Sequence, residues 1–220
     1  MRINFTSFNY KPGADLAAEE RAYLGEHVAL ARALPGLHIY LTGVYRANKG
    51  SVPAHHRAAF FGFDSAAASM AALESQAGAR MRAHGAAHLA DLRPMAMDGE
   101  EIVRFDGRRS GQRCFLFAAE FDLNRRPGEE LAAAEHRYLD YHTGVARRLP
   151  GLRYYMVGRL VDRSAPGGKA DRLRAALLVF DSVEAWRAAY RSPVGEELVK
   201  DEEASIANAR VHRLDAVVQL

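Results

Sequence analysis

The sequence predicts an α+β protein in which two β-α-β-β-α-β repeats pack sheet against sheet as one barrel within a single chain. Three observations lead to this prediction. The second half repeats motifs of the first half in the same order. Each half passes through the same succession of strand-like and helix-like patterns. The seam between the halves, near residues 100–111, is polar and glycine-rich but contains no long flexible linker.

Three motifs carry the internal repeat of this 220-residue chain. YLGEH is matched by YLDYH, ARALPGL by ARRLPGL, and FDS by a second FDS. The matched segments are 23–27 with 138–142, 31–37 with 146–152, and 63–65 with 180–182. Because their order is kept and their spacing nearly so, we predict one repeat at residues 1–105 and another at residues 106–220.

The first strand and first helix of each repeat follow from hydrophobic periodicity. Apolar runs ending near a Pro-Gly pair predict strands at 2–9 and 113–123. Apolar side chains at helical spacing predict helices at 15–34 and 129–149. A Pro-Gly pair then ends both helices.

The remaining elements follow in the same order in both halves. Residues rich in Ile, Val, Leu, Tyr and Phe predict paired strands at 37–46 with 56–63 and at 152–161 with 173–180. The Asp-Ser pairs after them can cap a second helix, which we expect to run to about residue 84 or 203. Final strands are expected at 92–97 and 209–218. This order is the ferredoxin-like unit, whose uncovered sheet face requires a partner sheet.

Composition narrows the class of protein. The chain is 49% hydrophobic and 26% charged, with a formal net charge of +3, and its basic residues are dispersed, which argues against nucleic-acid binding. Cys114 is the single cysteine, as expected in a reducing compartment. No apolar run approaches the roughly 20 residues of a membrane span, and the N-terminus does not read as an export signal. We therefore expect a cytoplasmic protein without membrane or nucleic-acid partners.

The Tyr-x3-His motif, the following Leu-Pro-Gly-Leu and a strand bearing Tyr40 or Tyr155 resemble the EthD-like group of dimeric α+β barrel proteins. Relatives in this group include a methylmuconolactone isomerase, decarboxylases, dehydratases, polyketide cyclases and cofactor-free monooxygenases. Most are single units that dimerise. The resemblance to the isomerase implies a pocket between helices and sheet formed by His27, Tyr40 and His55 or His56. That isomerase also uses a cysteine, which the first half of this sequence lacks.

His27 is the first candidate for catalysis. It falls on the apolar stripe of its helix, four residues after Tyr23, so its imidazole is expected to be buried. A histidine there can act as a general acid or base near neutral pH. The alternative is a packing hydrogen bond between helix and sheet. Because His142 repeats the position, duplication is consistent with either role.

His55 and His56 form the second candidate pair. Adjacent strand residues point to opposite faces, so only one can share a pocket with His27. Alternation would place His56 with Phe60, and His55 with Phe61 and Phe63. The second half carries Arg172-Leu173 instead of this pair, which favours a site in the first half. The alternative is a solvated strand end.

Other polar residues have structural as well as functional interpretations. Tyr40 could donate to a substrate oxygen or pack in the core, and the expected pocket lining comprises Tyr23, Phe61, Phe63, His142 and Tyr155. Glu120 and Asp122 are candidate carboxylates, with a solvated strand end as the alternative. His84 and His88 have a spacing that can chelate Zn²⁺, but no further ligand motif accompanies them. His38, His136 and His212 are interpreted as surface or packing residues.

The leading functional hypothesis is a small enzyme that needs no metal or other cofactor. His and Tyr acid/base chemistry would isomerise, dehydrate or ring-open an apolar oxygenated molecule such as a lactone, quinoid or polyketide-like carbonyl compound. One alternative is a non-catalytic protein that binds a hydrophobic metabolite, and another is a haem-binding barrel. An exposed helix face or sheet edge also leaves room for a homodimer.

Overall fold

The computed structural model describes residues 1–47, 52–161 and 173–220. The first half contains β1 (Arg2–Tyr10), α1 (Leu16–Ala22), η1 (Tyr23–His27), α2 (Val28–Arg32), β2 (Ile39–Tyr45), β3 (Arg57–Phe63), α3 (Ala66–Glu74), α4 (Gln76–His88) and β4 (Leu89–Val103). The second half contains β5 (Arg113–Leu123), α5 (Leu131–Arg137), η2 (Tyr138–His142), α6 (Thr143–Ala146), β6 (Leu152–Val161), β7 (Arg174–Phe180), α7 (Val183–Tyr190), α8 (Pro193–Ser205) and β8 (Ile206–Val218).

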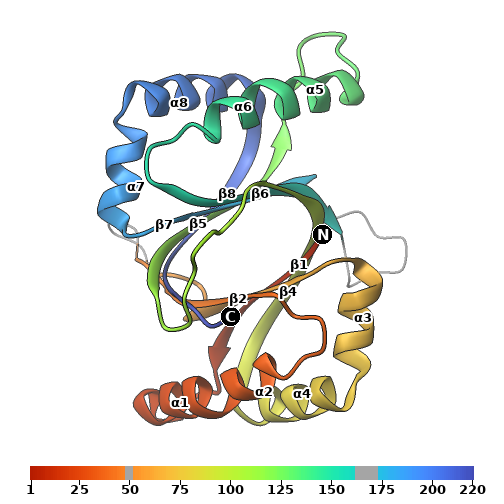
Figure 1. The fold of residues 1–220 in the computed structure, drawn as a ribbon, viewed down its shortest axis with the longest axis vertical. Coiled ribbons are helices and arrows are strands. Elements are labelled where there is room, and N and C mark those ends of the chain that lie inside the picture. Colours follow the sequence, from red (N-terminus) through yellow and green to blue (C-terminus); the bar gives the residue numbers. More distant parts are fainter. Residues whose placement is uncertain (48–51, 162–172) are drawn as a thin grey trace.

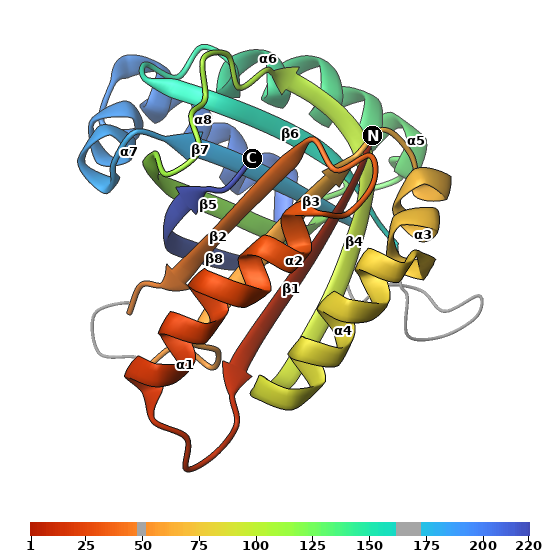
Figure 2. The same ribbon diagram turned by 60° about the horizontal axis from the view of Figure 1, so that its bottom comes forward.

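The eight strands close into one antiparallel barrel in the order β1-β3-β2-β8-β5-β7-β6-β4. The two halves join where β2 pairs with β8 and where β4 pairs with β6. Helices cover the two opposite outer sides of this barrel (Figure 1). In the first half, α1, α2 and α4 lie across the outer face of the strands (Figure 2). The predicted α+β class and intrachain barrel are confirmed.

Three apolar clusters follow from strand alternation. One fills the barrel with side chains from both halves, such as Phe5, Phe60, Leu116 and Leu177. The other two lie between each half's strands and its own helices. An interior cluster shared by both halves is what a ferredoxin-like sheet needs to cover its second face.

The last strand of the first half is longer than expected. The sequence predicts 92–97, whereas β4 runs from Leu89 to Val103, into the beginning of the expected seam. The reason is that β4 pairs on one side with β1 of its own half and on the other with β6 of the second half. The extra length of β4 allows it to pair with both β1 and β6.

The first helices also differ from a regular α-helix. Each contains a π-helical turn at the repeated Tyr-x3-His motif, where the N–H of Val28 donates to the carbonyl of Tyr23 and that of Thr143 donates to Tyr138. Of the predicted Asp-Ser caps, Ser65 and Ser182 accept from the first turns of α3 and α7. No described helix has both the length and the apolar character of a membrane span.

Expressed alone, residues 1–105 are expected to aggregate or to form a homodimer. This fragment would expose the interior faces of four strands and leave the edges of β2 and β4 without their partners. Size-exclusion chromatography with light scattering measures the outcome. A stable, folded monomer would show that the halves do not depend on each other.

Candidate functional site

The structure buries the expected His27 site between helices and sheet. The rings of Tyr23 and His27 stack at 5.0 Å, and the Tyr23 hydroxyl lies 3.4 Å from that of Tyr40 and 3.1 Å from Thr42 Oγ1. Tyr40 in turn stacks on Phe61. The four rings therefore form a packed aromatic cluster.

His27 has another histidine as its hydrogen-bond partner. Its Nδ1 lies 3.3 Å from Nδ1 of His84, whose ring stacks on that of His88 at 4.3 Å. Burial, together with the smaller effects of the neighbouring His84 and His88, lowers the pKa of His27 to about 4. His27 is therefore neutral at pH 7 and can donate only one ring hydrogen. Within the described part of the chain, no group of three or more His, Cys, Asp or Glu residues is arranged to hold a metal ion.

The second half retains most of this arrangement. Tyr138 and His142 stack at 4.7 Å, and Arg174 lies over the Tyr138 ring as Arg57 lies over that of Tyr23. His142 Nδ1–H donates to Asp201 Oδ2 at 2.7 Å, whereas His27 has a histidine as its partner. A Tyr-His-Arg arrangement kept in both halves is what a packing device copied by duplication would give.

The structure divides the predicted lining residues between the two halves. Phe61 and Phe63 lie with Tyr23 and Tyr40 in the apolar cluster between the strands and helices of the first half, whereas Tyr155 lies in the corresponding cluster of the second half. Burial raises the pKa of Tyr155, so its hydroxyl keeps its proton at neutral pH. His142 and Tyr155 therefore lie on the helix side of the second half, across the barrel from His27 (Figure 1).

His55 and His56 precede β3 and point in different directions. His56 Nε2 lies 2.8 Å from Glu20 Oε1 on the helix side, whereas His55 lines an opening at one end of the barrel. The expected sharing of faces with Phe60 or with Phe61 and Phe63 is wrong because the strand begins only at Arg57, so strict alternation does not extend to the histidines. Arg172, the counterpart in the second half, lies outside the described residues.

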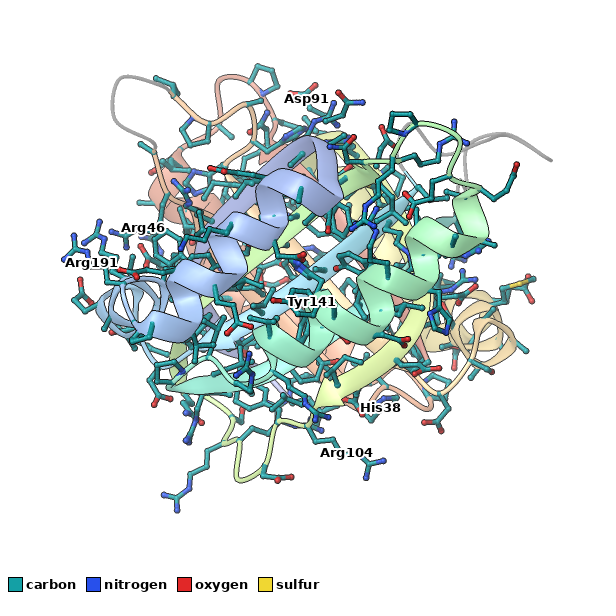
Figure 3. All side chains as sticks on the ribbon, turned by 90° about the horizontal axis from the view of Figure 1, so that it is seen from above. His38, Arg46, Asp91, Arg104, Tyr141 and Arg191 are labelled. Atoms are coloured by element: carbon teal, nitrogen blue, oxygen red, sulfur yellow. The ribbon has the colours of Figure 1, made fainter. Side chains whose placement is uncertain are left out.

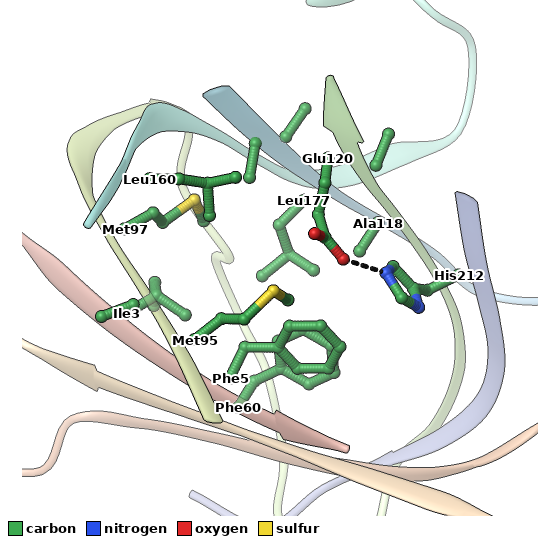
Figure 4. A pocket seen from close by; sticks show the side chains of 14 residues that line it. Ile3, Phe5, Phe60, Met95, Met97, Ala118, Glu120, Leu160, Leu177 and His212 are labelled. Atoms are coloured by element: carbon green, nitrogen blue, oxygen red, sulfur yellow. Dashed lines mark hydrogen bonds and ion pairs between the residues drawn. The ribbon is translucent and has the colours of Figure 1, made fainter. Parts of the chain in front are cut away.

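A second polar cluster, separate from the His27 site, lies in the barrel interior. His212 and Glu120 are 6% and 3% exposed, and His212 Nε2 lies 2.6 Å from Glu120 Oε1. Burial alone would raise the pKa of Glu120, but the hydrogen bond and charge of His212 and the charges of Arg93 and Arg210 outweigh burial and lower it. Glu120 is thus ionised and accepts from His212 Nε2–H (Figure 4).

The hydrogen-bond chain continues through Tyr45 to Ser7. The Tyr45 hydroxyl lies 3.0 Å from His212 Nδ1 and 2.6 Å from Ser7 Oγ. Burial raises the pKa of Tyr45 to about 12, although Ser7 and Arg93 act in the opposite direction. The tyrosine is therefore protonated at neutral pH, and Glu120 fixes the orientation of the imidazole that faces it.

Two hollows meet at His212. The inner one is a cavity of about 20 Å³ beside the stacked rings of Phe5 and Phe60, large enough for about one water molecule (Figure 4). The outer one, which we call the mouth, has a volume of about 430 Å³. Its lining comprises Tyr45, Arg46, Pro53, Ala54, His55, Arg93, Arg210, Val211, His212 and Arg213. Neither hollow is lined by His27 or His142.

The polar cluster is asymmetric between the halves. Strand register makes Ser7 equivalent to Glu120, because Phe8 pairs with Arg57 as Phe121 pairs with Arg174. The same reasoning gives three further equivalent pairs. These are Tyr45 with Leu160, Met95 with His212, and Arg93 with Arg210. The position equivalent to Tyr45 is thus occupied by Leu160, and the position equivalent to His212 is occupied by Met95.

The interpretation of His212 as a surface residue is therefore wrong, whereas a packing role is consistent with its contact with Phe5, and the solvated alternative for Glu120 is also wrong. Both are buried, and each shares its strand face with apolar side chains such as Ala118 and Leu214. That alternation is visible in the sequence. The distance between them is not, because Glu120 and His212 are 92 positions apart.

Comparisons with known proteins agree with the predicted resemblance and with the fold. Residues 126–209 match the family model of the EthD domain, which confirms the predicted resemblance in the second half. A search of curated proteins finds no match.

Solved structures resemble the whole chain. A protein from Fusobacterium nucleatum subsp. nucleatum ATCC 25586, named as a candidate monooxygenase, is 11% identical and has a TM-score of 0.69, with 99% of this chain and 93% of that chain covered. An anthrone oxidase-like protein is 14% identical with a TM-score of 0.60, covering 98% and 90%. A mutant chlorite dismutase from Candidatus Nitrospira defluvii is 11% identical with a TM-score of 0.55, covering 97% and 90%. Such low identities show the fold alone.

Acidification is expected to destabilise the protein through His27. Its folded pKa of about 4 lies below the ordinary 6.5, so the unfolded chain binds more protons between these values. The stabilising contribution is present above pH 6.5 and is lost as the pH falls towards 4, by on the order of 3 kcal/mol. Urea denaturation at pH 7, 5.5 and 4.5 measures this loss, which should be smaller in His27→Gln. Equal losses in both proteins would show that His27 does not titrate as described.

Proposed function

We propose that the protein is an enzyme that transfers protons to and from a small oxygenated molecule in the mouth of the barrel. The observation that carries this proposal is the buried chain of Glu120, His212 and Tyr45 beside an opening large enough for a ligand. The reaction class is isomerisation, dehydration or ring opening, as the sequence predicts. The location differs from the expected His27 pocket.

Each residue of the hydrogen-bonded series has a role in this proposed chemistry. Glu120 holds the Nε2–H of His212, which leaves Nδ1 facing the Tyr45 hydroxyl at 3.0 Å. An unprotonated Nδ1 can take the hydroxyl proton of Tyr45 as Tyr45 accepts a proton from the substrate. In the reverse direction, His212 returns a proton to Tyr45 as Tyr45 gives its own proton to the substrate. Arg93 lies close enough to add positive charge where a substrate oxygen becomes negative, since it lines the mouth and contacts Glu120 at 2.9 Å.

The repeat supports placing the chemistry here. The Tyr-His-Arg arrangement on the helix side is present twice, whereas Glu120, His212 and Tyr45 come together once in the described barrel. Of the residues first suggested from the sequence, His55 lies in the mouth. We propose it as a binding residue, while His27, Tyr40 and His56 form the competing site.

Replacing His212 by Gln is expected to slow proton transfer at least about a hundredfold. Glutamine keeps some hydrogen bonding but cannot exchange a proton near neutral pH. The measurement follows solvent deuterium entering a panel of lactones, quinones and β-keto compounds by proton NMR. Tyr45→Phe should reduce the rate similarly, because it removes the hydroxyl from the same chain.

His27→Gln and His142→Gln are the matched controls, each removing an imidazole from the helix side. Both should retain the rate after correction for the folded fraction. Loss of exchange in His27→Gln with full activity in His212→Gln would move the site to the helix side. Binding of a panel member without any exchange would instead favour the non-catalytic alternative.

A further inference from the structure

Arginine dominates the lining of the mouth. Arg46, Arg93, Arg210 and Arg213 all line it, and among its described lining residues there is no Asp or Glu. Arg46 extends to the periphery of the molecule (Figure 3), and its side chain is 34% exposed. Four positively charged side chains thus line one opening, whereas the whole chain has a formal net charge of only +3.

Nearby carboxylates neutralise only part of this charge. Nη1 of Arg46 donates to both carboxylate oxygens of Asp215, at 2.5 and 2.6 Å. Arg93 and Arg210 share one oxygen of Glu120, at 2.9 and 3.7 Å. Arg213 lies over the Trp186 ring. Arg93 and Arg210 therefore face a single carboxylate between them, which leaves a surplus of positive charge at this point of the opening.

Arg93 and Arg210 are arranged to bind a second anion. They are equivalent residues of the two repeats, on β4 and β8, and both approach the same oxygen of Glu120. Their side chains are 31% and 41% exposed, whereas that of Glu120 is 4% exposed, so the guanidinium groups remain accessible from the mouth. Guanidinium groups match the planar, bidentate geometry of carboxylates.

We propose that the mouth binds the carboxylate of a small organic acid between Arg93 and Arg210. The role of this binding in catalysis rests on the proposed function, because the bound acid would lie beside Tyr45 and His212. The apolar side chains of Pro53, Ala54 and Val211 provide contacts for the hydrocarbon part of such a molecule. The volume of about 430 Å³ exceeds the needs of an inorganic anion and lies in the range of small-molecule sites.

The experiment compares carboxylates with their neutral amides. Propionate, hexanoate, benzoate and phenylacetate are each titrated against the full-length protein in parallel with the corresponding amide, by isothermal titration calorimetry at low ionic strength. At least one acid should bind ten times more tightly than its amide. Its affinity should fall as salt is added, because the contacts are partly exposed to solvent.

Two variants locate the carboxylate. Arg210→Gln and Arg93→Gln should each weaken binding of that acid at least tenfold, while leaving the weaker binding of the amide nearly unchanged. Arg148→Gln is the matched control, since Arg148 is an exposed arginine paired with Glu197 on the helix layer. It should leave both affinities unchanged.

Three outcomes would overturn the inference. The acids and amides could bind equally, inorganic phosphate could bind as tightly as the best acid, or Arg148→Gln could weaken binding as much as the mouth variants do. None of these results bears on deuterium exchange through His212. Conversely, unchanged exchange in His212→Gln would refute the proposed chemistry while leaving selective carboxylate binding by Arg93 and Arg210 intact.

Discussion

The pairing of β2 with β8 and of β4 with β6 is the constraint on which the other features depend. These two strand pairings turn a pair of four-stranded sheets into a closed barrel and give both sheets a shared interior. They also bring Tyr45 and Arg93 of one half close to His212 and Glu120 of the other. Neither half alone contains this arrangement, so the candidate site exists only when the repeats are joined.

Carrying two repeats in one chain permits asymmetry that two identical subunits could not have. In a symmetric pair, each interior layer would contain the same residues twice. Here Met95 stands opposite His212, and Leu160 opposite Tyr45, so one side of the layer is apolar and the other carries the hydrogen-bond chain. On the helix side, by contrast, the stacked tyrosine and histidine remain in both halves.

The fold could be predicted from the sequence because its signals are local and occur twice. Hydrophobic periodicity, the Pro-Gly stops and the Ser65 cap each indicate the secondary structure of a neighbouring stretch of chain. The same kinds of signal occur again in the second half. The candidate site could not be predicted in the same way. Glu120 and His212 share faces with apolar residues, which signals burial, but only the barrel register brings them within 2.6 Å. Tyr45 falls within the predicted strand 37–46, and nothing in its local sequence indicates its contact with His212.

The central claim is that Glu120 holds the His212 imidazole in one orientation inside the closed barrel, with Nδ1 directed at Tyr45. Nitrogen-15 NMR of the histidine side chains tests this directly, with His212→Gln used to assign the signal. We predict a proton on Nε2 of His212 that exchanges slowly with solvent and whose signal shifts in Glu120→Gln. A His212 ring protonated only on Nδ1, or an Nε2 proton lost rapidly to solvent in the folded protein, would contradict the account.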